Sequence, residues 1–228
     1  MTRTLKTLLP ASILLLACLT SHAQNLEAVL NAMDKAAADF HSAQTDFVWD
    51  QYQKVVDEHD LQKGTMYFRR QSAEVQMAAD ITVPDKKYVL FSGGTVSVYL
   101  PKAAQVTEYN AGKNKADFET FLVLGFGGRG HDLAKSFDVK YAGMEQVEGV
   151  NAAKLELKPK SPKVANMFPT MTLWIDPARG VSVQQLFNEP SGDYRLAKYN
   201  NIKVNEKVPN DTFKLKTSGK VTYVRPNS

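Results

Sequence analysis

The residues with the most recognisable chemical spacing form the sequence GFGGRG at positions 125–130, which matches the GxGxxG pattern of dinucleotide-binding loops. In that fold the glycines follow a strand and precede a helix, whose N-terminus binds the phosphate groups. Here the order is reversed, because a helical pattern comes before the glycines and a loop is expected after them. We therefore interpret this segment as a hinge and not as a phosphate site.

Other catalytic or metal-binding patterns are absent from the sequence. The four histidines, His22, His41, His59 and His131, are far apart, and neither an HExxH nor a GxSxG motif occurs. Carboxylates are spread over expected turns, as at Asp57 and Glu58, although distant residues could still assemble an acid and base pair in space. We expect no enzymatic activity, no cofactor and no metal site.

Residues 1–23 have the features of an export signal. Arg3 and Lys6 give a positive start, Leu8–Leu19 is apolar, and Ser21-His22-Ala23 places small residues at the positions that a signal peptidase reads. The apolar stretch is shorter than the ~20 residues needed to span a bilayer as a helix. We expect residues 1–23 to be a signal peptide and residues 24–228 to be one soluble domain in the periplasm.

Cys18 leaves an alternative open. It ends Leu15-Leu16-Ala17-Cys18, which resembles the lipobox of bacterial lipoproteins, where the cysteine is acylated and tethers the protein to a membrane. Cys18 is also the sole cysteine of the chain, so residues 24–228 contain no disulfide and no thiolate metal site.

The charge of the chain argues against some partners. The formal net charge is +4, and cleavage after Ala23 would make it less positive by removing Arg3 and Lys6. Nucleic-acid-binding domains have clustered basic residues, which this chain lacks. We expect no nucleic acid, ATP or NAD as a partner.

Hydrophobic periodicity predicts one helix followed by many short strands. The helix places Leu26, Leu30, Met33, Ala37 and Phe40 on one apolar face. The strand patterns cover residues 46–56, 61–70, 73–81, 87–91, 96–100, 105–109, 137–141, 152–158, 170–176, 181–188, 195–204, 212–216 and 221–224. Short turns between about eleven strands favour an antiparallel meander in a curled or closed sheet, because parallel strands need long crossovers.

Two features suggest either a solid core or a lipid-sized cavity. In residues 73–81 one strand face is apolar, with Val75, Met77 and Ile81, and the other is mostly polar. A second helical pattern starts near Asn114, carries Phe118, Phe121 and Leu122 on one face, and stops at Gly125. Curled sheets covered by helices can be packed solid or can enclose a ligand, and composition does not choose between the two.

The chain resembles the periplasmic outer-membrane lipoprotein carriers of the LolA type over essentially all of residues 24–228. The matching parts are an N-terminal amphipathic helix that ends near Phe40 and residues 64–70, 89–94, 98–101, 155–159, 199–202, 208–213 and 219–221. The resemblance implies an incomplete antiparallel β-barrel of about eleven strands, with helices covering its open side and an apolar cavity for acyl chains.

The resemblance also implies a set of site residues. Arg70, at the end of the second strand, matches an arginine that contacts the lid and helps to set its open or closed state. The expected cavity residues are Met66, Phe68, Val75, Met77, Ile81, Phe91, Phe118, Phe121 and Leu122.

We therefore expect a monomeric carrier that shields lipoprotein acyl chains. By resemblance, its partners are an inner-membrane lipoprotein-releasing transporter and an outer-membrane acceptor. The alternatives are a membrane-tethered acceptor of the same fold, if Cys18 is acylated, and a lipid-sensing regulatory module or cofactor-free enzyme built on that fold.

Overall fold

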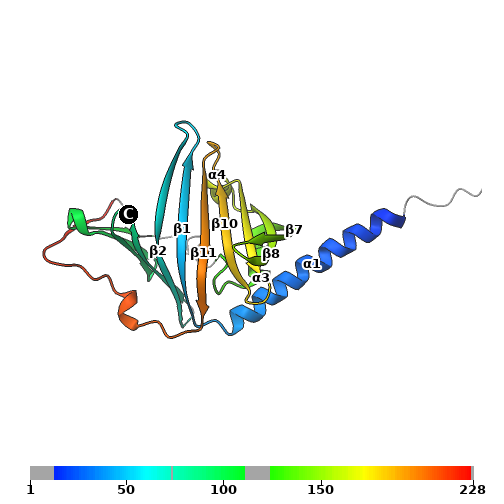
Figure 1. The fold of residues 1–228 in the computed structure, drawn as a ribbon, viewed down its shortest axis with the longest axis horizontal. Coiled ribbons are helices and arrows are strands. Elements are labelled where there is room, and N and C mark those ends of the chain that lie inside the picture. Colours follow the sequence, from blue (N-terminus) through cyan, green and yellow to red (C-terminus); the bar gives the residue numbers. More distant parts are fainter. Residues whose placement is uncertain (1–12, 73, 111–123, 227–228) are drawn as a thin grey trace, which may run out of the picture.

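A computed structural model describes residues 13–72, 74–110 and 124–226, with side chains described from residue 25 onward. Within these residues the fold is one curved sheet of twelve strands with helices packed on part of its inner face (Figure 1). The helices are α1 (Ile13–Ala38), α3 (Gly130–Ser136), α4 (Pro162–Met167) and the 3₁₀ turns η1 (Pro101–Ala103) and η3 (Asn210–Phe213). The strands are β1 (Ser42–Gln53), β2 (Glu58–Gln71), β3 (Glu74–Val83), β4 (Lys87–Ser92), β5 (Thr95–Leu100), β6 (Gln105–Asn110), β7 (Phe137–Val147), β8 (Val150–Pro159), β9 (Thr170–Asp176), β10 (Val181–Asn188), β11 (Tyr194–Val204) and β12 (Thr222–Val224).

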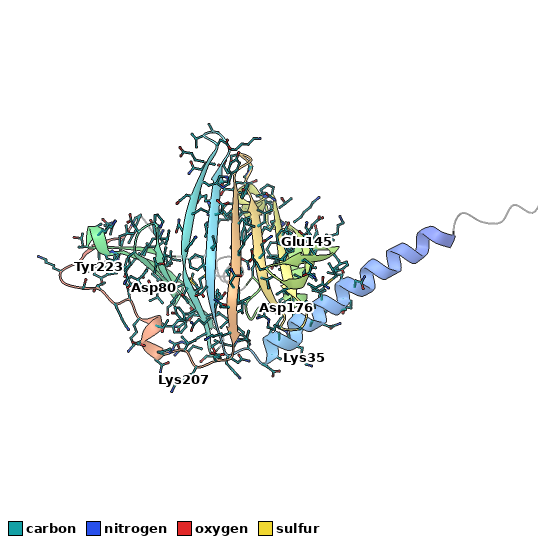
Figure 2. All side chains as sticks on the ribbon, in the orientation of Figure 1. Lys35, Asp80, Glu145, Asp176, Lys207 and Tyr223 are labelled. Atoms are coloured by element: carbon teal, nitrogen blue, oxygen red, sulfur yellow. The ribbon has the colours of Figure 1, made fainter. Side chains whose placement is uncertain are left out.

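The strand order is β12-β6-β5-β4-β3-β2-β1-β11-β10-β9-β8-β7. Within β1 to β6 and within β7 to β11, each strand pairs antiparallel with the next strand along the chain, with α4 between β8 and β9. The pairing of β1 with β11 joins the two halves of the sheet. The outer strands β7 and β12 do not pair with each other, so the sheet is not closed into a barrel. Figure 2 shows Glu145 of β7 and Tyr223 of β12 on opposite sides of the molecule.

The predicted mainly β fold of an incomplete barrel with helices is confirmed, with three corrections in detail. Of residues 212–216, predicted as a strand, 212 and 213 lie in the 3₁₀ turn η3 and 214–216 follow it outside any strand, because Pro209 and the polar residues after it favour a turn. The closing strand β12 pairs with β6 in parallel, not antiparallel. The helices α3 and α4 were not predicted, since each has fewer than eight residues and gives little periodicity.

The inner face of the sheet carries two clusters of buried apolar side chains. One lies between α1, α3, α4 and strands β7 to β10, and it includes Met33, Leu133 and Leu155. The other surrounds Phe40 and Phe126 on the β1 to β3 side. The apolar face predicted for the first helix supplies both clusters. Met33 of α1 lies in the first cluster and Phe40, just after the helix end, lies in the second, and each side chain is 2% exposed.

The glycine-rich segment 125–130, predicted as a hinge, packs closely between these clusters. Gly125 and Gly127 adopt φ values of +81° and +76°, a region that L side chains rarely enter. A Cβ atom on Gly127 would lie 2.5 Å from the Phe40 ring, and one on Gly130 would lie 2.5 Å from the Leu30 carbonyl oxygen. The glycines allow this close approach, and α3, not a loop, begins at Gly130.

Substitution of Gly127 by alanine tests this packing. We expect Gly127→Ala to lower the free energy of unfolding by roughly 2–4 kcal/mol, from left-handed strain and overpacking together. Gly149→Ala is the matched control, because Gly149 has φ +80° but nothing within 4 Å of its added Cβ, so only the strain of roughly 1 kcal/mol applies. Urea unfolding of both variants measures the difference, and equal losses would contradict the packing role of Gly127.

Candidate ligand-binding site

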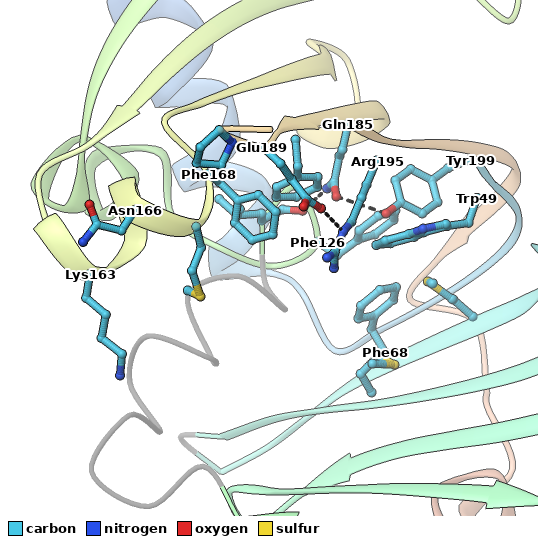
Figure 3. Close-up of a pocket in the computed structure, with 16 residues that line it drawn as sticks. Trp49, Phe68, Phe126, Lys163, Asn166, Phe168, Gln185, Glu189, Arg195 and Tyr199 are labelled. Carbon is cyan, nitrogen blue, oxygen red and sulfur yellow. Dashed lines mark hydrogen bonds and ion pairs between the residues drawn. The ribbon is translucent and has the colours of Figure 1, made fainter. Parts of the chain in front are cut away.

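A pocket of about 760 Å³ opens on the inner face of the sheet. Its walls come from strands of both halves of the sheet, from the turn before α3 and from α4 (Figure 3). The residues that line it are mainly apolar or aromatic: Trp49, Met66, Phe68, Met77, Leu124, Phe126, Lys163, Asn166, Met167, Phe168, Gln185, Phe187, Glu189, Pro190, Arg195 and Tyr199.

Strand alternation explains why these side chains meet. Successive residues of a strand point to opposite faces, so every second residue faces the pocket. Met66 and Phe68 on β2 alternate with Tyr67, which lines a small cleft on the other face together with Asp80 and Asp211. At β2 the sheet therefore offers an apolar wall on the inner face and a polar surface on the outer face.

Phe126 forms the floor of the pocket. Its ring stacks on Phe68 at a centroid distance of 4.6 Å and meets Tyr199 edge to face at 5.1 Å, and it is 1% exposed. The tight turn around Phe126, with a glycine on each side, places this ring against strands of both halves of the sheet. The turn thus fills the space between the two halves below the pocket.

The polar groups next to this floor form hydrogen bonds with one another and with the backbone. The Tyr199 hydroxyl donates to Oε1 of Gln185 at 3.1 Å, and Nε2 of Gln185 donates to the Leu124 carbonyl oxygen. Complete burial raises the pKa of the Tyr199 hydroxyl far above its ordinary value, so this group stays neutral. The deep end of the pocket therefore holds no charge among the described residues.

Arg70 joins the end of α1 to the turn that carries Phe126. Its Nη1 donates to the Ala37 carbonyl oxygen at 3.0 Å, and its Nη2 donates to the Gly127 carbonyl oxygen at 2.7 Å. The guanidinium carbon also lies 5.8 Å from the centre of the Phe40 ring. The planar fork of arginine can bind two carbonyls at once, which a lysine ammonium cannot do with the same geometry.

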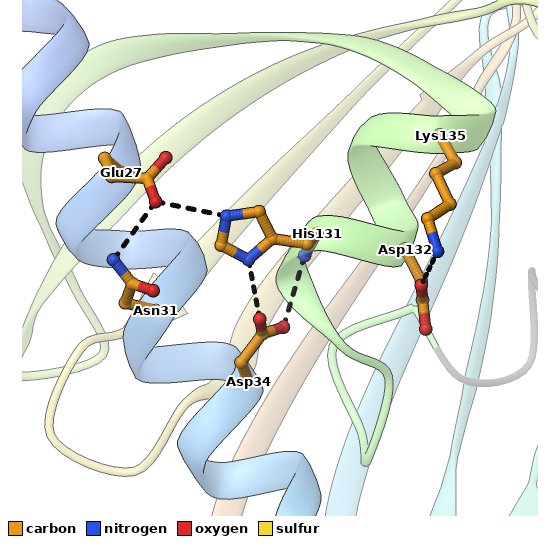
Figure 4. Close-up of polar contacts among 6 residues, drawn as sticks. All are labelled: Glu27, Asn31, Asp34, His131, Asp132 and Lys135. Atoms are coloured by element: carbon orange, nitrogen blue, oxygen red, sulfur yellow. Dashed lines mark hydrogen bonds and ion pairs between the residues drawn. The ribbon is translucent and has the colours of Figure 1, made fainter.

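His131 provides a second link between α1 and the segment before β7 (Figure 4). Its Nδ1 lies 2.6 Å from Oδ2 of Asp34, its backbone N–H donates to Oδ1 of Asp34 at 3.2 Å, and its Nε2 lies 3.1 Å from Oε1 of Glu27. The hydrogen bond to Asp34 and then that to Glu27 raise the pKa of His131. Burial alone would raise the pKa of Asp34, but the hydrogen bonds from His131 outweigh it, and the pKa is lowered.

The structure brings together only part of the residues expected to line a cavity. Met66, Phe68 and Met77 lie on the pocket wall. Ile81 packs in the cluster beneath, whereas Val75 and Phe91 are buried elsewhere and do not line the pocket. The expected residues Phe118, Phe121 and Leu122 lie outside the described residues.

Several lining residues were not foreseen from the sequence. Trp49, Phe187 and Tyr199 follow the same strand alternation as Met66, so alternation could have placed each of them on the inner face. Their meeting in one pocket depends on the pairing of β1 with β11, which joins segments far apart in the chain. Phe126 stands between two glycines, and a single aromatic residue there has no strand or helix periodicity that could predict its burial.

The described residues contain neither a metal-binding cluster nor a membrane-spanning helix. No group of three or more histidine, cysteine, aspartate or glutamate side chains is close enough to hold a metal ion within residues 13–72, 74–110 and 124–226. Among the same residues, no helix is long and apolar enough to cross a membrane.

Comparison with known proteins adds a family match. The model of the family described as outer membrane lipoprotein carrier protein LolA matches residues 38–216. No curated protein matches the chain.

Solved structures share the fold at low sequence identity. MucB of Pseudomonas aeruginosa, solved in complex with MucA, is 16% identical with a TM-score of 0.55, covering 88% of this chain and 64% of that one. An uncharacterized conserved protein from Thermus thermophilus is 13% identical with a TM-score of 0.58, covering 89% of this chain and 99% of that one. The chain thus spans less than two thirds of the MucB chain, and at these identities the similarity shows the fold alone.

The contact of His131 with Asp34 and Glu27 predicts a pH dependence of stability. A histidine whose pKa is raised by folding stabilises the fold fully below its unfolded pKa of about 6.5, and this contribution is lost as pH rises through the folded pKa. We expect the melting temperature of the protein to exceed that of His131→Gln most at mildly acidic pH and least at alkaline pH. At more acidic pH the difference in melting temperature should shrink again. The pKa of Asp34 is lowered in the folded protein, and its contribution to stability is lost as pH falls through that pKa, because protonation of the carboxylate breaks the pair with His131.

Thermal melts across this pH range measure the difference. His41→Gln is the matched control, because the His41 side chain is exposed and makes no hydrogen bond or ion pair with any described residue. A constant difference between the protein and His131→Gln at all pH values would contradict the ionic role of His131.

Proposed function

The chain belongs to the LolA family of outer membrane lipoprotein carrier proteins, and we propose that it is a periplasmic carrier that shields the acyl chains of lipoproteins in the pocket floored by Phe126. The single observation that carries this proposal is the apolar pocket itself. At about 760 Å³ it falls in the range of small-molecule sites, ~300–1,000 Å³, and apolar side chains from both halves of the sheet line it.

The physical need for such a container is simple. Exposure of an acyl chain to water costs ~0.8 kcal/mol per CH₂ group, so a lipoprotein crosses an aqueous compartment only if its chains are covered. Residues 1–23 support export to that compartment, as their charge and apolar pattern are those of a signal peptide. The partners that we propose are a lipoprotein-releasing transporter and an outer-membrane acceptor.

Release needs a competitor for the acyl chains, and we propose the Phe126 turn for that role. The Phe126 ring stacks on Phe68 and meets Tyr199 edge to face, so entering acyl chains would exchange one apolar contact for another. Arg70 holds this turn to the end of α1 through two carbonyl oxygens. A ligand that displaces the turn must break or bend these bonds, which keeps its affinity low enough for transfer.

No chemical step is part of this proposal. Tyr199 and Gln185 bond each other and the backbone, and burial keeps the tyrosine neutral. A carrier needs an apolar surface of this kind, whereas an enzyme needs polar groups that converge on a reacting atom.

Binding of an apolar probe tests the pocket. We expect the dye ANS to bind the folded protein and to be displaced by acyl lipids. Met77→Gln should weaken dye binding about tenfold, because an amide of similar size replaces an apolar wall. Met144→Gln is the matched control, since Met144 is exposed on β7 and does not line the pocket. Dye binding that is absent, or equal in both variants, would overturn the acyl-binding proposal.

Arg70→Leu separates loading from transfer. We expect this variant to load lipoprotein normally but to transfer it poorly. Loss of the two hydrogen bonds destabilises the conformation in which the Phe126 turn is held against α1, so return to that conformation drives release of the acyl chains less strongly. Loss of the two bonds should also lower the free energy of unfolding by roughly 1–3 kcal/mol.

Arg69→Leu controls for the loss of stability. Arg69 is the neighbouring arginine on the opposite strand face, where its guanidinium binds Gln76 and Asn210 and covers the Phe213 ring at 4.2 Å. We expect Arg69→Leu to destabilise the fold without changing the ratio of transfer to loading. Equal effects of both variants on that ratio would mean that Arg70 is a structural residue only.

A further inference from the structure

An ion pair lies on the wall of the mainly apolar pocket. Arg195 follows the inner-face alternation of β11, in step with Ala197 and Tyr199, and so its side chain points into the pocket. Glu189 is the first residue after β10, the strand that pairs with β11. Nε of Arg195 donates to Oε1 of Glu189 at 2.7 Å, and Figure 3 shows the pair next to the aromatic floor.

The guanidinium of Arg195 keeps unused donors. Its carbon atom lies 5.3 Å from the centre of the Phe168 ring, and only Nε makes a hydrogen bond with any described residue. Nη1 and Nη2 therefore have no partner within the described part of the chain. Arg195 is half-buried, with 37% of its side chain exposed, and Glu189 is 22% exposed.

The other polar residues of the pocket differ from Arg195. Gln185 and Tyr199 are buried and already bond each other. Lys163 and Asn166 lie on the exposed side of α4, and the Lys163 ammonium points away from the ion pair (Figure 3). Among the described residues of the pocket wall, Arg195 is thus a half-buried group that can still donate hydrogen bonds to a ligand.

We propose that the Arg195–Glu189 pair binds the neutral carbonyl oxygen at the polar end of an acyl chain, that is, an ester or amide rather than a free carboxylate. The inference rests on the proposed function, because it takes the apolar chain to fill the pocket beside Phe126 and Phe168. The carbonyl oxygen then accepts from Nη1 or Nη2, which an apolar pocket wall could not offer.

Glu189 gives the pair its preference for a neutral oxygen. Its carboxylate already balances the guanidinium charge, so a second carboxylate at Nη1 or Nη2 would face a like charge a few ångströms away in a partly dry site. An ester or amide oxygen meets no such repulsion. The pocket should therefore select acyl groups joined to glycerol or to an amine over free fatty acids.

Two ligands that share one acyl chain test this preference, namely monolauroylglycerol and laurate, each used below its micelle concentration at mildly alkaline pH. Displacement of bound ANS gives their affinities. We expect the protein to bind monolauroylglycerol more tightly than laurate. Arg195→Met should lower the affinity for monolauroylglycerol about tenfold, the size expected for a lost hydrogen bond from a charged donor.

Glu189→Gln provides the test of charge. It leaves the guanidinium uncompensated, so we expect laurate to bind about tenfold more tightly while monolauroylglycerol changes little. Arg179→Met is the matched control, because Arg179 makes the same Nε bond, to Oδ2 of Asp176 at 2.6 Å, but does not line the pocket. It should leave both affinities unchanged.

The outcomes separate this inference from the proposed function. If the protein binds both ligands equally and neither Arg195→Met nor Glu189→Gln alters an affinity, the carbonyl site is wrong but the acyl pocket stands. If the protein binds neither ligand and no ANS, both the acyl pocket and the carbonyl site are wrong. A melting curve for each variant confirms that any loss of binding occurs in folded protein.

Discussion

The constraint on which this structure depends is that a twelve-stranded sheet curls without closing. A closed barrel buries its inner face against itself, whereas an open one must cover that face with other elements. Here α1, α3, α4 and the turn around Phe126 cover one part, and the pocket lies beside them among the described residues. The proposed binding site is thus the part of the inner face that the elements within residues 13–72, 74–110 and 124–226 do not cover.

Besides the two apolar clusters, specific polar and close contacts hold the covering elements in place. Arg70 ties the end of α1 to the Phe126 turn, and His131 ties the middle of α1 to the start of α3. Gly127 lets the turn lie against the Phe40 ring. Because these contacts all meet on α1 and the turn, a change in any one of them alters how the inner face is covered.

The sequence was sufficient for most of the fold, because strand alternation and turn residues are local signals. It was insufficient for the site, since the pocket forms where β1 pairs with β11, some 150 residues apart in the chain. Met66, Phe68 and Met77 were foreseen on the pocket wall, but Trp49, Phe126 and Tyr199 were not. The proposed role of Arg195 also needed the structure, because its hydrogen bond to Glu189 depends on how the chain turns between β10 and β11.

Site-specific photo-crosslinking to an acylated lipoprotein tests the central claim most directly. A photoreactive residue replaces either Met66, on the pocket wall, or its neighbour Tyr67, on the opposite face of β2. The account predicts that the residue at position 66 crosslinks to the acyl chains and that the one at position 67 does not. Equal crosslinking at both positions, or crosslinking at position 67 alone, would contradict binding of the acyl chains in this pocket.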